Sequence, residues 1–278
     1  MTTHILLIDC PDEKGLVYRI TGELSRNDFN IVSNHEFVDA STEHFFMRTA
    51  FAGGASPEHI VEALRKTLPA GANIRLAAAD KRPIVILATR EAHCLGDLLV
   101  RNAFDELPAR ICAVISNHEV LGPLVQKFDI PFHYVPHQDL EREQHEQKVL
   151  DAIAPYAPDY LVLAKYMRVL TPQFVAHYPS RIINIHHSFL PAFMGASPYR
   201  QAFERGVKII GATAHFVTDD LDTGPILVQN VQHVDHTYSA ADMAQAGRDI
   251  EKIVLSRALK LVLEERVFLH HNRTIIFE

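Results

Sequence analysis

Residues 184–191, Asn-Ile-His-His-Ser-Phe-Leu-Pro, place an amide and two imidazoles directly after an apolar run. Asn184 and His186 lie two positions apart at the end of a predicted strand, so the twofold period of a strand puts both side chains on one face. An amide NH₂ donates hydrogen bonds, and an imidazole can donate or exchange a proton near neutrality. The pair could therefore stabilise a developing oxyanion. Alternatively, both side chains only cap the strand end and bond the loop backbone.

A second group of polar residues occupies Thr-Ala-His-Phe-Val-Thr-Asp-Asp-Leu-Asp-Thr-Gly-Pro, residues 213–225. Thr213 and His215 alternate on a predicted strand, and the loop after it carries three aspartates, Asp219, Asp220 and Asp222. Carboxylates this close repel one another, and a buried one would have a raised pKa. Such a group could act as a base near neutral pH. Acidic loops are also common as solvated turns, so that alternative stays open.

A third segment, Ala-Lys-Tyr-Met-Arg-Val-Leu at 164–170, follows the apolar run Tyr160–Ala164. Its Met167, Val169 and Leu170 could line a flat apolar pocket for an aromatic ligand, with Arg168 beside them. The alternative is ordinary core packing at the start of the next helix.

The first eighty residues alternate short elements in the order β-α-β-β-α-β, which predicts a small ferredoxin-like α+β domain over residues 1–80. Its helices are expected to begin at Asp12, as a cap, and at Ser56-Pro57, as a cap followed by proline at the first helical position. Its strands are expected at His4–Asp9, Phe29–Val38, His44–Phe51 and Asn73–Ala78.

A polar stretch ending at Pro83 predicts a linker, and residues 83–278 form the second predicted domain. Continuous apolar runs alternate with helical patterns, which predicts a Rossmann-like, mostly parallel α/β sheet covered on both faces. Its strands are expected at 84–88, 111–116, 132–135, 160–164 and 181–186, followed by a longer pair at 209–217 and 224–233. Its helices are expected at 95–104, 120–128 and 140–153, with a long one from Ser239, where Asp242 completes a capping box. A hairpin with Asn272 in its turn closes the chain.

Composition narrows the possible classes of function. The 278 residues carry a net charge of −7, so no basic surface for nucleic acid is indicated. No apolar run is long enough for a membrane span, and the N-terminus lacks the basic region of a signal peptide. Three dispersed cysteines with no C-x-x-C pair support neither disulfides nor a zinc-thiolate site, which favours the reducing cytoplasm. No pattern indicates a bound metal.

The turn after the first strand of the larger domain reads Ala-Thr-Arg-Glu-Ala-His-Cys-Leu-Gly-Asp. It contains neither G-x-G-x-x-G nor G-x-x-x-x-G-K-[ST], so nucleotide binding of the Rossmann or P-loop type is not supported.

Taken together, the segments at 164–170, 184–191 and 211–225 resemble the formyl-tetrahydrofolate transferases and hydrolases, and this resemblance covers about residues 83–278. The front region, through Pro-Asp-Glu-Lys-Gly-Leu-Val-Tyr-Arg-Ile-Thr-Gly at 11–22 and Asn-Ile-Val at 30–32, is similar to an ACT domain, a module that often binds amino acids.

The resemblance implies roles for particular residues. The catalytic Asn, His and Asp of the family match Asn184, His186 and Asp222. The segments matching Met167–Leu170 and Val217–Asp222 would hold the pterin, mostly through backbone atoms. His187, Ser188, Thr213 and His215 would support the site, with His215 able to orient Asp222.

Two departures from the transferases bear on the acceptor. A Gly/Ser/Asn-rich phosphate loop is replaced by Arg90–Asp97, and His187 replaces a proline that the transferases usually carry. The expected reaction is therefore hydrolysis of 10-formyltetrahydrofolate to formate and tetrahydrofolate, with no permanently bound cofactor. Transfer of the formyl group to an amine, or folate and amino-acid sensing without turnover, remain the alternatives.

For the ACT-like domain, the resemblance implies a small amino-acid effector such as glycine or methionine. The candidate effector residues are Asp12, Gly15, Leu16, Asn30 and Ile31. The alternative is that this domain only makes an oligomer contact. A homodimer or homotetramer is expected, because exposed sheet faces and edges tend to be covered by partner copies.

Overall fold

The computed structural model describes residues 3–54, 57–78, 80–191 and 198–278, and the chain divides into two compact units. The first comprises Met1–Asp80, Glu264–Phe268 and Ile275–Glu278, and the second comprises Lys81–Leu263 and Leu269–Thr274. The sequence pattern predicts one domain over all of residues 83–278. The two C-terminal segments depart from that assignment, because their aromatic side chains pack in the core of the first unit.

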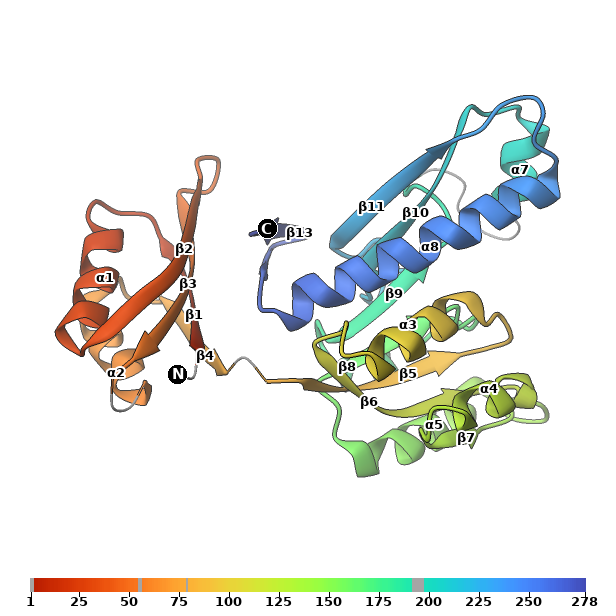
Figure 1. Cartoon of the computed structure of the whole chain (residues 1–278), viewed down its shortest axis with the longest axis horizontal. Coiled ribbons are helices and arrows are strands. Elements are labelled where there is room, and N and C mark those ends of the chain that lie inside the picture. The colour runs from red at the N-terminus through yellow and green to blue at the C-terminus, as the bar shows by residue number, and fades with distance from the viewer. Residues whose placement is uncertain (1–2, 55–56, 79, 192–197) are drawn as a thin grey trace. The chain divides into compact units, whose positions relative to one another are not determined.

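The first unit is an antiparallel sheet of order β2-β3-β1-β4, and α1 and α2 contribute to the apolar core on one of its faces (Figure 1). Its elements are β1 (Thr3–Pro11), α1 (Leu16–Arg26), β2 (Phe29–Asp39), β3 (His44–Gly53), α2 (Glu58–Thr67) and β4 (Asn73–Ala78). This is the predicted ferredoxin-like arrangement.

The predicted helix caps of this unit differ from the observed ones. Asp12 does not cap α1, because the chain turns at Gly15, which has φ 92° and occupies the N-cap position. Only glycine adopts this left-handed conformation without a steric cost. At α2, Pro57 is the N-cap and not the first helical residue, and the predicted cap Ser56 lies outside the described residues.

The opposite face of the first sheet is covered by the C-terminal segment of the chain. Phe268 and Phe277 form one buried cluster with Ile5, Leu7 and Phe46. Arg48 fixes the segment further, donating from Nε to the Glu265 carbonyl at 2.7 Å and from Nη2 to the Glu264 carbonyl at 3.0 Å. The last residues of the chain therefore complete the core of the first unit.

The second unit is a seven-stranded sheet of order β11-β10-β9-β8-β5-β6-β7. Neighbours from β9 to β7 pair in parallel, and β10 pairs antiparallel with both β9 and β11. The strands are β5 (Arg82–Ala88), β6 (Ala109–Ser116), β7 (Phe132–Tyr134), β8 (Tyr160–Ala164), β9 (Ile182–His186), β10 (Ile209–Phe216) and β11 (Ile226–His233). This confirms the predicted mostly parallel α/β class, with the expected longer antiparallel pair.

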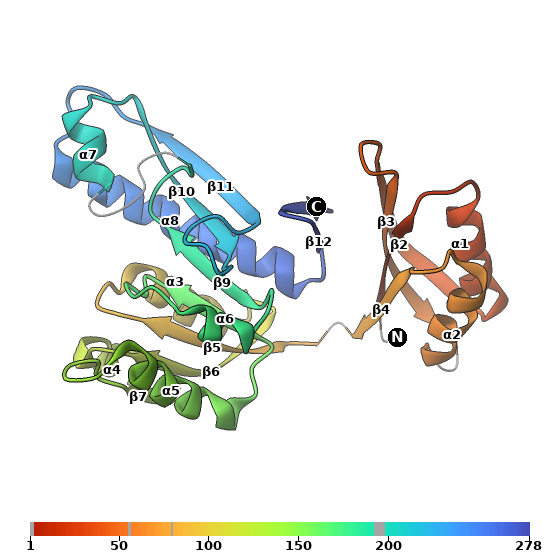
Figure 2. The same ribbon diagram turned by 180° about the vertical axis from the view of Figure 1, so that it is seen from behind.

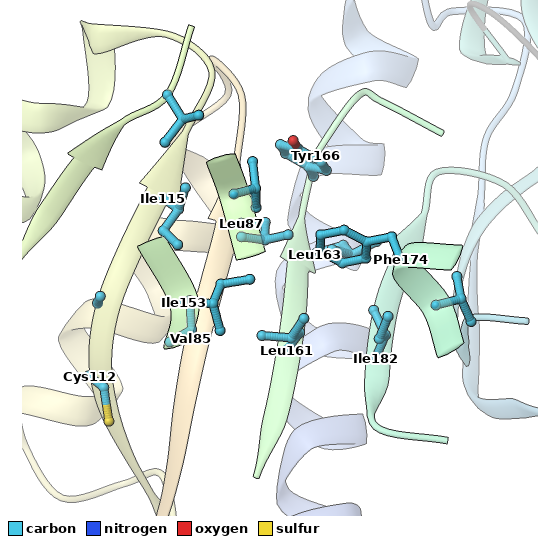
Figure 3. Packing of buried hydrophobic residues seen from close by; sticks show 14 residues of the cluster. Val85, Leu87, Cys112, Ile115, Ile153, Leu161, Leu163, Tyr166, Phe174 and Ile182 are labelled. Atoms are coloured by element: carbon cyan, nitrogen blue, oxygen red, sulfur yellow. The ribbon is translucent and has the colours of Figure 1, made fainter. Parts of the chain in front are cut away.

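Helices cover both faces of this sheet, as Figures 1 and 2 show from opposite sides. The helices are α3 (His93–Ala103), α4 (Gly122–Gln126), α5 (Arg142–Ile153), α6 (Pro172–Ala176), α7 (Pro198–Glu204) and α8 (Ala240–Leu263), with the 3₁₀ turns η1 (Glu119–Leu121) and η2 (Ala154–Tyr156). On one face, α8 packs against α3 and β10. On the other, α5 and α6 contribute to the core drawn in Figure 3, where Ile153 and Phe174 meet Leu161, Leu163 and Val85.

The end of the chain follows the predicted pattern. The Ser239–Asp242 capping box is present, since Asp242 Oδ2 accepts from the Ser239 backbone N–H at 2.9 Å and the Asp242 N–H donates to Ser239 Oγ at 3.2 Å. The predicted hairpin is β12 (Val267–His270) and β13 (Arg273–Ile276). All three cysteines are buried free thiols. Among the described residues, no helix has the length and apolar character needed to cross a membrane.

Candidate active site

The antiparallel register between β9 and β10 brings the first two candidate segments together. Asn184 faces His215 across the two strands, and His186 faces Thr213. Residues directly opposite one another in such a pair have side chains close enough to interact. His186 is the last residue of β9, so these side chains lie toward the carboxyl end of a parallel strand, where ligands bind in open α/β sheets.

His215 fixes the side chain of Asn184. Its Nδ1 donates to the Phe216 carbonyl at 2.9 Å, and its Nε2 lies 3.2 Å from Asn184 Nδ2. Burial lowers the pKa of His215, so the ring is neutral and Nε2 is an acceptor for the Asn184 amide. The Asn184 NH₂ is thereby held in one orientation, with its second hydrogen left for another acceptor. His215 thus positions Asn184. Its Nε2 lies 3.7 Å from Asp222 Oδ1, which is too far for a hydrogen bond to that carboxylate.

His186 and Asp222 form the second half of the site. His186 Nδ1 lies 3.3 Å from Asp222 Oδ2, and His186 Nε2 is buried without a hydrogen-bond partner among the described residues. Burial alone would raise the pKa of Asp222, but the hydrogen bond from His186 and the nearby histidines lower it overall. The expected raised pKa in this acidic loop is therefore wrong for Asp222. It stays a carboxylate and orients the imidazole.

The loop that carries Asp222 returns tightly to the sheet. Thr218 and Thr223 both donate from their hydroxyls to the Asp220 carbonyl, at 3.2 and 3.1 Å. At Gly224, an added Cβ would lie 1.8 Å from the Phe216 carbonyl oxygen, so only glycine allows this approach. The Asp219 and Asp220 side chains are exposed, which leaves Asp222 as the aspartate that faces the histidines.

Asn184, His186, His215 and Asp222 line one cavity of about 360 Å³. The rest of its lining comes mainly from the 165–170 segment and the 217–221 loop, with Leu163, Ile185 and His187. The size and the mixture of apolar walls with convergent polar groups suit a small-molecule ligand. The structure therefore brings the three candidate segments into one site.

Residues 167–170 were expected either to line an apolar ligand pocket or to pack in the core, and the segment does both. Met167 and Val169 are 56% and 48% exposed and line the cavity, so they are available to an apolar ligand. Leu170 lines the cavity as well but also packs against the core cluster beneath it. Arg168 lies between them at the wall.

Ser188 and Thr213, which were expected to support the site, are buried and are not part of the cavity lining. Thr213 Oγ1 donates to the Ser188 carbonyl at 2.9 Å and accepts from the Leu190 N–H at 3.1 Å and from Gln229 Nε2 at 3.0 Å. These bonds tie the loop after His186 to β10 and β11. Gln229 was not among the candidates, and its half-buried position on the edge strand β11 gives no sequence signal for this role.

A buried charged cluster beside the cavity was also missed by sequence analysis. Glu251 on α8 and Lys165 after β8 are 0% and 4% exposed, and Lys165 Nζ lies 3.3 Å from Glu251 Oε2. His93 Nε2 lies 2.7 Å from the same oxygen, and the Tyr199 hydroxyl donates to Glu251 Oε1 at 2.6 Å. Burial would raise the pKa of Glu251, but these partners lower it to about 2. A carboxylate within the apolar stripe of α8 was the available signal.

The same cluster contains a possible set of metal ligands. Donor atoms of His93, Cys94 and Glu251 all lie within 4.8 Å of one another. However, burial raises the pKa of the Cys94 thiol far above its usual value, and Lys165 already places a positive charge beside Glu251. A metal needs thiolate and free carboxylate ligands, so the arrangement suits an ion pair better than a bound cation.

At the first cluster of effector candidates, Leu16 is buried in the core of the first unit, so its side chain is not available to a ligand. The Asp12 N–H donates to the Glu43 carbonyl at 2.8 Å, and Gly15 forms the turn into α1. Asn30 is exposed and Ile31 is half-buried at the start of β2.

The fold and the site together define a formyl transferase-type catalytic unit that follows a ferredoxin-like module. Residues 82–259 match the formyl transferase family, and residues 4–69 match the ACT domain. Formyltetrahydrofolate deformylase of Escherichia coli K12 is 59% identical over 98% of this chain and 97% of its own length. The chain belongs to the formyltetrahydrofolate deformylase family.

Solved structures agree with this placement. A formyltetrahydrofolate deformylase from Pseudomonas syringae pv. tomato DC3000 superposes with a TM-score of 0.95 at 40% identity, covering 100% of this chain and 95% of that one. Glycinamide ribonucleotide transformylase 1 from Symbiobacterium toebii has a TM-score of 0.69 at 27% identity, covering 76% of this chain and all of that one. The second structure shows that the fold of the catalytic unit is shared with an enzyme named for glycinamide ribonucleotide, an amine acceptor.

Proposed function

We propose that this chain hydrolyses 10-formyltetrahydrofolate to formate and tetrahydrofolate. The observation that carries the proposal is the convergence of Asn184, His186 and Asp222 on one cavity, with the Nε2 atom of His186 buried and unpaired. The full-length likeness to proteins named formyltetrahydrofolate deformylase supports the choice of substrate.

In the proposed mechanism the pterin lies against Met167–Leu170 and the 217–222 loop, with the formyl carbon beside Asn184 and His186. A water oxygen attacks that carbon, and its proton passes to Asp222 directly or to His186 Nε2. With Nδ1–H held by Asp222, His186 can accept at Nε2 and then donate from it. Asn184 donates to the tetrahedral oxyanion, as in other oxyanion holes. Cleavage of the C–N bond, with a proton delivered to the folate nitrogen, releases formate and tetrahydrofolate.

The test is to incubate the protein with 10-formyltetrahydrofolate, with and without amine acceptors, and to measure free formate. Formate released at the same rate in both cases supports hydrolysis. Formate that fails to appear without an amine would overturn the proposal.

Formyl transfer to an amine, such as a ribotide or a charged tRNA, is the main alternative, because the fold is shared with a named transformylase. The loop between β5 and α3 argues against a ribotide phosphate there. It carries Arg90 and Glu91 and lacks the run of small residues whose backbone N–H groups cradle phosphate. A sensor without turnover would bind the folate and release no formate.

For the first unit we propose a small amino-acid effector, glycine or methionine, bound near the turn at Asp12–Gly15 and the start of β2 at Asn30. The match to the ACT domain supports this proposal. Equilibrium binding of each amino acid to the full chain tests it, with Asn30→Ala as the variant expected to weaken binding. Equal binding by the variant, or no binding by the wild type, would contradict it.

We further propose that the enzyme acts in the cytoplasm, supplies formate for purine biosynthesis and balances the one-carbon pool, as a homodimer or homotetramer. The composition and the free buried cysteines support the compartment. Light scattering at several protein concentrations tests the assembly, and a monomer throughout would contradict it.

A further inference from the structure

A second cavity, of about 770 Å³, adjoins the first one in the catalytic unit. The two share Lys165, Met167 and His187, which therefore form the boundary between them. If the folate fills the first cavity, the second is the route by which another substrate could reach the formyl carbon. Its lining carries three carboxylates, Glu91, Glu204 and Glu251, and three basic side chains, Lys165, Arg200 and Arg248, so its charge does not exclude a neutral amine.

Lys165 is a rigid part of this boundary. Its side chain is 4% exposed, and its Nζ lies 3.3 Å from Glu251 Oε2 and 3.8 Å from Glu91 Oε1. Its backbone has φ 60°, a left-handed conformation that is costly for any residue with a Cβ. Burial and the two nearby carboxylates hold the lysine side chain in one place at the boundary.

The partners of Glu251 show that Lys165 is not needed to satisfy that carboxylate. His93 and Tyr199 both bond to Glu251, one on each oxygen. Both oxygens of Glu251 therefore keep a hydrogen-bond partner even without the lysine. What the lysine adds is the volume of its side chain at the boundary between the two cavities.

We propose that Lys165, held by Glu251, is a specificity-determining residue that closes the second cavity to amine acceptors and so leaves water as the nucleophile. This inference rests on the proposed hydrolysis and deepens it. It assigns the choice between hydrolysis and formyl transfer to one side chain that lies outside the Asn184–His186–Asp222 group.

The experiment opens this boundary with Lys165→Gly. Glycine adopts a positive φ without strain, and His93 and Tyr199 still bond to Glu251, so the variant is expected to fold with lower stability than the wild type. Lys165→Met is the matched control, because it keeps most of the volume and loses the charge, and Lys165→Ala is a second opening variant.

Each protein receives 10-formyltetrahydrofolate and glycinamide at about pH 8, where a large fraction of an α-amino group is neutral. In the new reaction the amine nitrogen forms a bond to the formyl carbon, the bond from that carbon to the folate nitrogen breaks, and the amine proton passes to the folate nitrogen.

Formate and N-formylglycinamide are both measured. The wild type and Lys165→Met should release formate, whereas Lys165→Gly and Lys165→Ala should increase the formamide-to-formate ratio by about tenfold or more, the scale on which pocket volume discriminates substrates. A folded, folate-binding Lys165→Gly protein that forms no formamide would overturn the inference. So would equal diversion by Lys165→Met. A wild type that releases no formate would instead count against the proposed function.

Discussion

His186 has one ring nitrogen paired with Asp222 and another that is buried and unpaired. Unpaired buried polar atoms are rare in native proteins, and they often mark the place of a ligand or a water. At the residue scale, the contact with Asp222, whose pKa is lowered, and the unpaired Nε2 describe an imidazole that is already oriented before substrate binds.

Replacing the carboxylate tests that orientation. Asp222→Asn should reduce kcat by at least about a hundredfold, because positioned acid–base groups contribute roughly 10²–10⁴ in rate. The KM for 10-formyltetrahydrofolate should change little, since the substituted side chain keeps its size. Steady-state formate release gives both parameters. Near-normal kcat in a folded Asp222→Asn protein would remove Asp222 from the mechanism.

His187 gives the protein a pH-dependent stability. Burial, with the charge of Lys165, lowers its pKa from 6.5 to about 4. Between these values the unfolded chain binds a proton that the folded chain does not, so the unfolding free energy should fall as pH decreases from 6.5 to about 4. His187→Asn should show a shallower decrease in denaturant titrations across this window. An unchanged slope would mean that other groups account for it.

At the scale of elements, α8 carries the carboxylate that holds the buried cluster together. Glu251 occupies the inner side of the helix with Val254 and Leu255, both fully buried. Gly247, one turn earlier, makes room for Tyr199, because an added Cβ there would lie 2.0 Å from the tyrosine ring. The helix therefore carries Glu251 and also leaves room for Tyr199, which donates a hydrogen bond to Glu251.

Removing the charge of Glu251 should be costly. Glu251→Gln leaves Lys165 buried with only the more distant Glu91, and breaking a buried pair in this way typically costs about 3–5 kcal/mol. In the wild type, the pKa of Glu251 is lowered from 4.5 to about 2. The contribution of its carboxylate to the unfolding free energy is therefore present above pH 4.5 and is lost as pH falls toward 2. Urea titrations at several pH values measure both effects.

A matched change on the same helix provides the control. Lys252→Met removes an exposed pair with Asp249, which should alter the unfolding free energy by less than about 1 kcal/mol. Equal losses in Glu251→Gln and Lys252→Met would contradict the special role of the buried pair.

At the scale of the whole molecule, the chain end returns to the first unit after completing the second. Phe268 and Phe277 meet edge to face, with ring centroids 5.8 Å apart, and cover Phe46 on the sheet. The first unit therefore requires residues from both ends of the sequence for its core.

Phe277→Ala should lower the unfolding free energy of the first unit by roughly 3–5 kcal/mol, the usual cost of removing a buried aromatic side chain. Hydrolysis should persist under native conditions, because the catalytic residues belong to the second unit. Chemical denaturation of the full chain, followed together with formate release, measures the two effects. Stability that remains unchanged would contradict the packing role of Phe277.

Much of the fold could be predicted from sequence, because its signals are local. The apolar runs at 160–164 and 182–186 became β8 and β9, and the Ser239–Asp242 box begins α8 as expected. The predicted cap at Asp12 was wrong because Gly15 occupies the N-cap position in a left-handed conformation, which only glycine adopts without a steric cost. Short-range periodicity therefore predicted which helices and strands form more accurately than where they begin and end.

The sequence by itself determined which chemical groups are available, since the spacing of Asn184 and His186 on one strand is a local property of the chain. Tertiary structure alone decided what those groups meet. The β9–β10 register set His215 against Asn184, and the fold brought Glu251 from α8 to Lys165. Charge state followed from these contacts, because burial and neighbouring charges act through space and reversed the pKa shift expected for Asp222.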